Sequence, residues 1–117
     1  MTPPKLPQGP VKSVRWVRST VIVEVSGDID LGTSSAFQQA MWGLLDEDPK
    51  RIVMILKDVP YMDSSGVATL VKLLSKIRKS GATLALAAMT DRVRSVFEIT
   101  RLDGIFEVYL TEKEAMA

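Results

Sequence analysis

The sequence predicts an α/β fold with a mixed, mostly parallel sheet of about five strands and about four helices. Apolar segments of strand length alternate along the chain with segments of helical periodicity. Two strand-like segments, residues 11–17 and 20–25, come first and directly follow one another. The length of 117 residues suffices for one hydrophobic core and leaves little room for a second domain. The predicted order is β-β-α-β-α-β-α-β-α.

The start of the chain differs in composition from the rest. Residues 1–10 contain four prolines and a glycine, which disfavour regular structure. We therefore expect a flexible, proline-rich segment over residues 1–10 and a folded domain over residues 11–117.

The first two predicted strands are rich in β-branched side chains, which favour extended structure. The polar pair Arg18-Ser19 between them predicts a tight turn, and Gly27 ends the second strand. A helix is expected next, because apolar side chains then recur at helical spacing, at Phe37, Ala40, Met41, Leu44 and Leu45. Its candidate N-caps are the hydroxyl residues Thr33, Ser34 and Ser35.

Residues 51–56 form a nearly unbroken apolar run, which is typical of a central strand covered on both faces. The next segment predicts a helix that ends near Gly81. Its expected apolar face consists of Val67, Leu70, Val71, Leu74 and Ile77.

The last third of the chain repeats the alternation. Residues 83–88 predict a buried strand, and Thr90-Asp91 then cap a helix that is expected to run through Leu102. Residues 105–109 predict a last short strand, and residues 111–115 the start of a terminal helix.

Composition excludes several functions. The sequence has no cysteine and no histidine, which rules out disulfides, Cys or His metal sites and a triad with a histidine base. The net charge of +1 and the absence of a basic run give no support for a nucleic-acid partner. No apolar run approaches a membrane span, and the first residues lack a signal-peptide core. We expect a cytoplasmic protein without membrane insertion, metal or cofactor.

The segment Asp63-Ser64-Ser65-Gly66 lies between the central strand and the second helix. Serines there lie at the positive end of a helix dipole, beside backbone N–H groups without partners. A phosphate on either hydroxyl would gain hydrogen bonds, whereas the carboxylate of Asp63 would repel it, and these opposing effects suit a reversible modification. On position alone, a plain helix N-cap is the commoner role for such residues.

Three segments together resemble the STAS family, which comprises bacterial anti-sigma-factor antagonists and related transporter-associated domains. Residues 63–66 resemble the family signature. Residues 26–30, Ser-Gly-Asp-Ile-Asp, resemble its Gly-acidic-apolar-Asp segment, and residues 81–86 resemble its Gly-bounded turn into a later strand. The resemblance covers nearly the whole chain from about Val11, and it implies a single STAS-like domain.

The resemblance implies a non-enzymatic switch that regulates sigma-factor-dependent transcription. Such an antagonist binds an anti-sigma serine kinase when unphosphorylated, is released when the kinase phosphorylates it, and is reset by a phosphatase. The implied phosphoacceptor is Ser64, with Ser65 as second choice or as a helix cap. We expect a monomer or weak dimer. The residues implied for the switch loop and partner surface are Asp28, Asp30, Met62, Asp63, Ser65, Gly66 and Val67.

Other functions remain open from the sequence. Gly66-Val67-Ala68 replaces the Gly-Leu-Gly that often follows the serines in the family, and the Ala68 methyl narrows the approach of a partner. The same segment also resembles STAS subunits of lipid-type ABC transporter permeases, and a stressosome component is a third alternative. An enzyme is not expected, because the chain has no Gly-x-Ser-x-Gly elbow, P-loop or dinucleotide fingerprint. Asp30 and Asp63 could nevertheless serve as an acid pair for hydrolysis.

Overall fold

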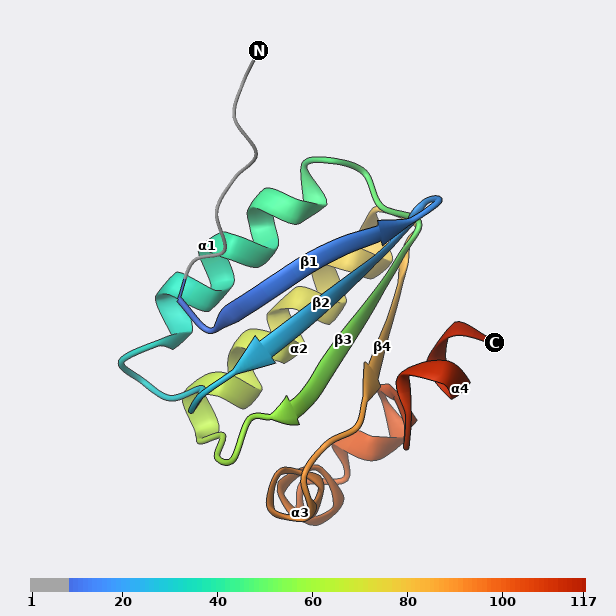
Figure 1. Ribbon diagram of the computed structural model, residues 1–117. Coiled ribbons are helices and arrows are strands. Elements are labelled where there is room, and N and C mark those ends of the chain that lie inside the picture. The colour runs from blue at the N-terminus through green and yellow to red at the C-terminus, as the bar shows by residue number, and fades with distance from the viewer. Residues whose placement is uncertain (1–8) are drawn as a thin grey trace.

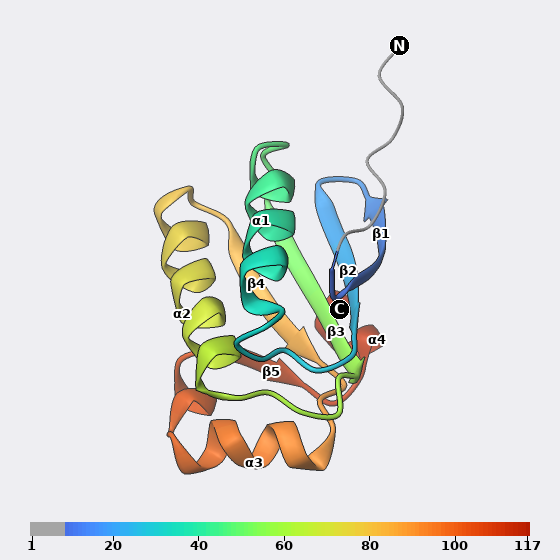
Figure 2. The ribbon, with the colours of Figure 1, turned by 90° about the vertical axis from the view of Figure 1, so that its left-hand side faces the viewer.

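Five strands form one sheet, in the order β1-β2-β3-β4-β5 across its width (Figures 1 and 2). The computed structural model describes residues 9–117, so most of the segment predicted to be flexible lies outside the described residues. β1 pairs antiparallel with β2, and all other neighbours are parallel, which confirms the predicted mixed sheet. The strands are β1 (Val11–Val17), β2 (Thr20–Ser26), β3 (Arg51–Asp58), β4 (Thr83–Ala87) and β5 (Glu107–Tyr109).

The helices lie on both faces of the sheet. α1 and α2 cover one face, and α3 crosses at the end where the parallel strands terminate, while α4 packs on the opposite face (Figures 1 and 2). The helices are α1 (Ser34–Leu45), α2 (Ser64–Lys79), α3 (Asp91–Ile99) and α4 (Glu112–Met116), with a 3-10 turn at Leu102–Gly104.

The main core lies between the sheet and α1, α2 and α3. Residues 52–56 of β3 are all buried, as the apolar run predicts for a central strand. One detail of the predicted α2 face is wrong, because Val71 is 42% exposed and Leu73 is buried instead. Viewed along the helix axis, the buried face points in the direction between Leu73 and Ile77. Because successive residues are turned by about 100°, the Val71 side chain points away from that face, toward solvent.

The end of α3 also differs from the prediction. α3 stops at Ile99, because Arg101 adopts a left-handed conformation with φ of 59°. The amides of Ile105 and Phe106 then donate hydrogen bonds to the carbonyl of Leu102, so these residues belong to a turn. β5 therefore begins at Glu107, later than predicted.

The side chain of Arg51 links α4 to the strands that α4 covers, on the face of the sheet opposite α1 and α2. It donates hydrogen bonds to the carbonyl of Ala115 in α4 (3.1 Å), to Thr83 Oγ1 (3.0 Å) and to both carboxylate oxygens of Glu107 (3.2 and 3.4 Å). Tyr109 also donates to Glu107, at 2.9 Å. The hydrogen bond from Arg51 is the main cause that holds the pKa of Glu107 below its ordinary value of 4.5.

This ion pair predicts a pH-dependent contribution to stability. Because folding lowers the pKa of Glu107, the contribution is fully present above pH 4.5 and is lost as the pH falls through the folded-state value. The free energy of unfolding of Glu107→Gln should be below that of the wild type at pH 7, by less than about 1 kcal/mol since the pair is partly exposed. The difference should vanish in strong acid. Urea denaturation of both proteins from pH 7 to 3 tests this, with exposed Glu98→Gln as control; a constant difference across that range would contradict it.

Candidate functional site

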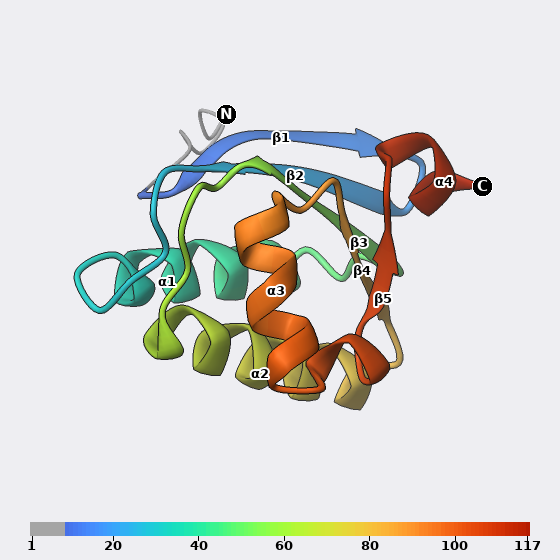
Figure 3. The same cartoon turned by 90° about the horizontal axis from the view of Figure 1, so that it is seen from below.

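The loops that follow β2 and β3 lie side by side at the carboxyl end of the sheet (Figure 3). Ile29 and Met62 form a parallel bridge between them. The Ile29 amide donates to the carbonyl of Tyr61 at 3.0 Å, and the Ile29 carbonyl accepts from the amide of Asp63 at 3.2 Å. The two acidic segments singled out in the sequence are thus brought together as one paired structure, which we call the switch site (residues 27–33 and 59–66).

Asp63 is the N-cap of α2. Its Oδ1 accepts hydrogen bonds from the amides of Ser65 (2.8 Å) and Gly66 (3.1 Å). Its Oδ2 accepts from the amide of Leu31 in the other loop, at 3.2 Å. The predicted role of Ser65 as a helix cap is therefore wrong, because Asp63 is the N-cap and Ser65 already lies within the first turn of α2.

Ser64 is the first residue of α2, and it is exposed. Ser65 is half-buried, and its carbonyl accepts a hydrogen bond from Thr69 Oγ1 at 3.0 Å. The Ser64 side chain is thus the more accessible of the two candidate phosphoacceptors. Its hydroxyl lies beside the positive end of a helix of 16 residues.

The loop after β2 is held by its own side chains. Asp30 Oδ1 accepts from the amides of Gly32 (2.9 Å) and Thr33 (3.1 Å). Thr33 Oγ1 in turn donates to the carbonyl of Asp28 at 2.9 Å. Thr33, one of the three predicted candidates, occupies the N-cap position of α1, although its side chain makes no capping hydrogen bond there. Asp28 itself is exposed.

Gly66 is buried, and it packs closely against the loop after β2. A Cβ on Gly66 would lie 2.5 Å from the carbonyl oxygen of Ile29 and 2.7 Å from Cγ of Met62. Met62 is 2% exposed, and its side chain packs in the main core beneath the surface of the switch site. Val67 is half-buried against the main core. These residues shape the site, whereas Ser64 and Asp28 lie at its surface.

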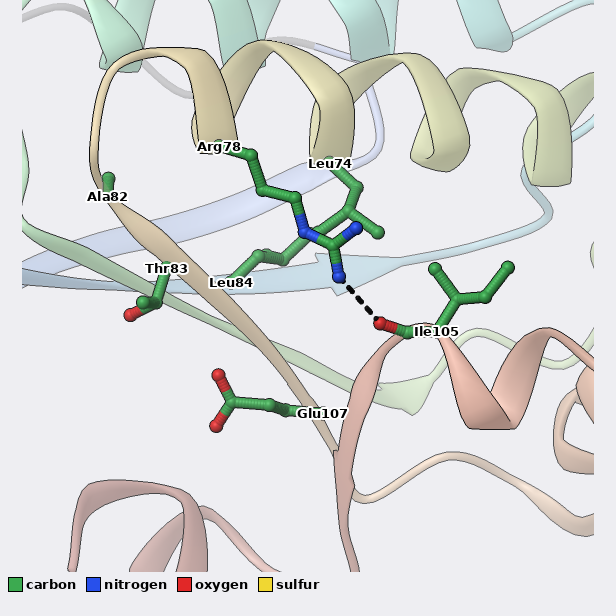
Figure 4. Close-up of a pocket in the computed structure, with 7 residues that line it drawn as sticks. All are labelled: Leu74, Arg78, Ala82, Thr83, Leu84, Ile105 and Glu107. Carbon is green, nitrogen blue, oxygen red and sulfur yellow. Dashed lines mark hydrogen bonds between the residues drawn. The ribbon is translucent and has the colours of Figure 1, made fainter.

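A small pocket lies at the opposite end of α2 (Figure 4). Its volume of about 70 Å³ is well below the roughly 300 Å³ of the smallest usual ligand sites. The guanidinium of Arg78 is already bonded to the carbonyl of Ile105, at 3.0 Å. The lining residues are Leu74, Arg78, Ala82, Thr83, Leu84, Ile105 and Glu107.

Residues 9–117 lack two further features, a cluster of metal ligands and a membrane-spanning helix. They contain no group of three acidic side chains placed to hold a metal ion. Within the same range, no helix has the length and apolar character needed to cross a bilayer.

The domain is an antiparallel hairpin that leads into parallel β-α units, with Asp63 as the cap of the helix that begins at Ser64. The model of the STAS domain family matches residues 12–115, and the chain belongs to this family. The anti-sigma-B factor antagonist of Bacillus subtilis is 27% identical over 95 residues, which cover 81% of this chain and 86% of that protein.

Solved structures agree with this assignment. A crystal structure of a Thermotoga maritima protein has a TM-score of 0.84 and 28% identity, and the match covers 89% of this chain and 90% of that one. The crystal structure of an anti-sigma factor antagonist from Mycobacterium paratuberculosis has a TM-score of 0.81 and 28% identity, with coverage of 89% and 88%. The fold is therefore shared over nearly the whole length of each protein.

Proposed function

We propose that this protein is an anti-sigma-factor antagonist and acts as a non-enzymatic switch. In its unphosphorylated form it binds an anti-sigma serine kinase through the switch site, and phosphorylation of Ser64 releases it. A serine phosphatase resets the cycle. The observation that carries the proposal is the exposed Ser64 immediately after Asp63, the residue that caps α2. The relatives that are named antagonists support the same role.

The geometry around Ser64 favours release of a partner without refolding of the domain. A phosphate on Ser64 would carry a charge of about −1.5 to −2 at neutral pH. The amides of Ser65 and Gly66 already donate to Asp63, so they are not free to bind the phosphate. The added charge therefore stays at the surface beside a carboxylate, where a partner in contact with Ser64 would have to desolvate it.

A pull-down from native-host lysate tests the proposal with wild type, Ser64→Ala and Ser64→Glu as baits. We expect an anti-sigma serine kinase, identified by mass spectrometry, with wild type and Ser64→Ala, and at least a tenfold lower yield with Ser64→Glu. The matched control is Ser75→Glu, which places the same charge on an exposed serine eleven residues further along α2, about 16 Å away. The control should capture the kinase as the wild type does.

Incubation of the recovered kinase with ATP should then phosphorylate the wild type at Ser64, and Ser64→Ala should remain unmodified. Equal capture of the kinase by wild type and Ser64→Glu would contradict the proposal. A transporter permease or ATPase captured equally by both would favour the accessory-subunit alternative, and Ser64 would then be only the first residue of α2.

A further inference from the structure

We propose that Leu31 is the apolar anchor of the partner surface and that Asp63 is the positioning residue that holds it beside Ser64. The inference rests on the proposed function and adds residues to its interface. The anti-sigma serine kinase would then present an apolar pocket that receives the Leu31 side chain. Three observations support this assignment: the exposure of Leu31, the hydrogen bonds that hold its loop, and its hydrogen bond to Asp63, the residue next to Ser64.

Leu31 is 79% exposed, and its backbone amide donates to the carboxylate of Asp63. Nearby Tyr61 is also partly exposed, but the guanidinium of Arg92 lies over its ring, 5.0 Å from the centroid. Among the large apolar side chains of the switch site, that of Leu31 is therefore the most exposed. The side chain contributes little to the core, and a partner that covers it would gain the free energy of burying its apolar surface.

Several hydrogen bonds hold the backbone around Leu31, whereas its side chain is exposed. Asp30 Oδ1 binds the amides of Gly32 and Thr33, and Thr33 Oγ1 accepts from the amide of Asp30 at 3.0 Å. On the N-terminal side of Leu31, Ile29 is paired with Met62 of the neighbouring loop, which also holds the backbone in place. An exposed apolar side chain on a preorganised loop can be buried by a partner at a low cost in conformational entropy.

The carboxylate of Asp63 connects the loop of Leu31 to the start of the helix that carries Ser64. Asp63 Oδ1 caps the helix that begins with Ser64, while Asp63 Oδ2 accepts the Leu31 amide at 3.2 Å. A typical stable interface covers about 800 Å² on each partner, which is a patch with a radius of roughly 16 Å. If a phosphate on Ser64 releases the partner, the partner must cover Ser64 in the complex. A patch of that size around Ser64 also includes Leu31, because the Leu31 amide is bonded to Asp63, the residue next to Ser64.

Leu31→Ala tests the anchor directly. The probe is the anti-sigma serine kinase recovered in the pull-down, expressed and purified, with affinity measured by calorimetry. We expect Leu31→Ala to weaken binding about tenfold or more, the usual effect of truncating an anchor residue, with an unchanged melting temperature. The control is Val17→Ala, which truncates a 45% exposed side chain at the far end of the β1–β2 hairpin. Its affinity should equal that of the wild type.

Asp63→Asn tests the positioning role. Asparagine is as good an N-cap as aspartate, so its oxygen can still accept from Ser65 and Gly66. Its amide nitrogen is a donor and cannot accept from the Leu31 amide. We expect faster hydrogen exchange of the Leu31 amide and an affinity for the kinase that is several-fold weaker. The double variant Leu31→Ala/Asp63→Asn should bind like Leu31→Ala alone, because the two residues act as one unit.

The outcomes separate the two proposals. If Ser64→Glu abolishes binding while Leu31→Ala binds like the wild type, the phosphorylation switch is supported and the anchor is overturned. If the effects of Leu31→Ala and Asp63→Asn simply multiply, Asp63 does not act through Leu31. If the kinase binds Ser64→Glu as well as the wild type, the phosphorylation switch fails whatever Leu31 does. If no anti-sigma kinase is recovered with the wild type, both proposals fall.

Discussion

Gly66→Ala is expected to lower the free energy of unfolding by about 1–3 kcal/mol, and by more if the loops separate. The new Cβ would lie 2.5 Å from the carbonyl oxygen of Ile29, which is backbone and cannot rotate away. That carbonyl also accepts from the Asp63 amide at 3.2 Å, so relief of the clash would break the pairing of the two loops. Helix propensity alone would favour alanine by about 1 kcal/mol, so a net loss isolates the steric effect.

Urea denaturation measures this loss, with Gly104→Ala as the matched control. A Cβ on Gly104 has no neighbouring heavy atom within 4 Å, so the control should be neutral or stabilising by less than about 1 kcal/mol. The clash at Gly66 should also displace α2 from the loop of Leu31 and weaken capture of the kinase. Equal stability of the two alanine variants would show that the close approach at Gly66 is not a constraint.

Phe97→Ala should cost about 3–5 kcal/mol, a large part of the stability of a domain of this size. Phe97 is fully buried and packs edge-to-face on Phe106, with ring centroids 5.5 Å apart and an interplanar angle of 82°. Its removal leaves a cavity between α3 and the main core. The measurement is the free energy of unfolding from urea denaturation. Phe97→Leu, which keeps most of the volume, measures the loss should the alanine variant not fold.

The control for Phe97 lies on the same helix. Ile99 is 81% exposed, so Ile99→Ala removes a large apolar side chain without opening a cavity and should change stability by less than about 0.5 kcal/mol. A loss for Phe97→Ala no larger than that for Ile99→Ala would mean that α3 does not depend on this packing.

The sequence predicted best where a single local pattern decides the structure. The apolar run of residues 51–56 predicted a buried central strand, and the polar pair Arg18-Ser19 between β-branched segments predicted a hairpin; the structure confirms both. Prediction was poorer where two local patterns compete. Val71 and Leu73 are both apolar and lie two residues apart in α2, so periodicity alone did not decide which of them is buried. That choice depends on where the sheet lies.

The site shows the same division. The sequence by itself determined that Asp63 and Ser64 lie between a central strand and a helix, because cap and turn residues act on their immediate neighbours. Only the tertiary structure decided that Leu31, 32 residues earlier in the chain, is the third donor to the Asp63 carboxylate that caps α2. The parallel pairing of β2 with β3 brings these loops together, and no pattern within either loop encodes the hydrogen bond that joins them.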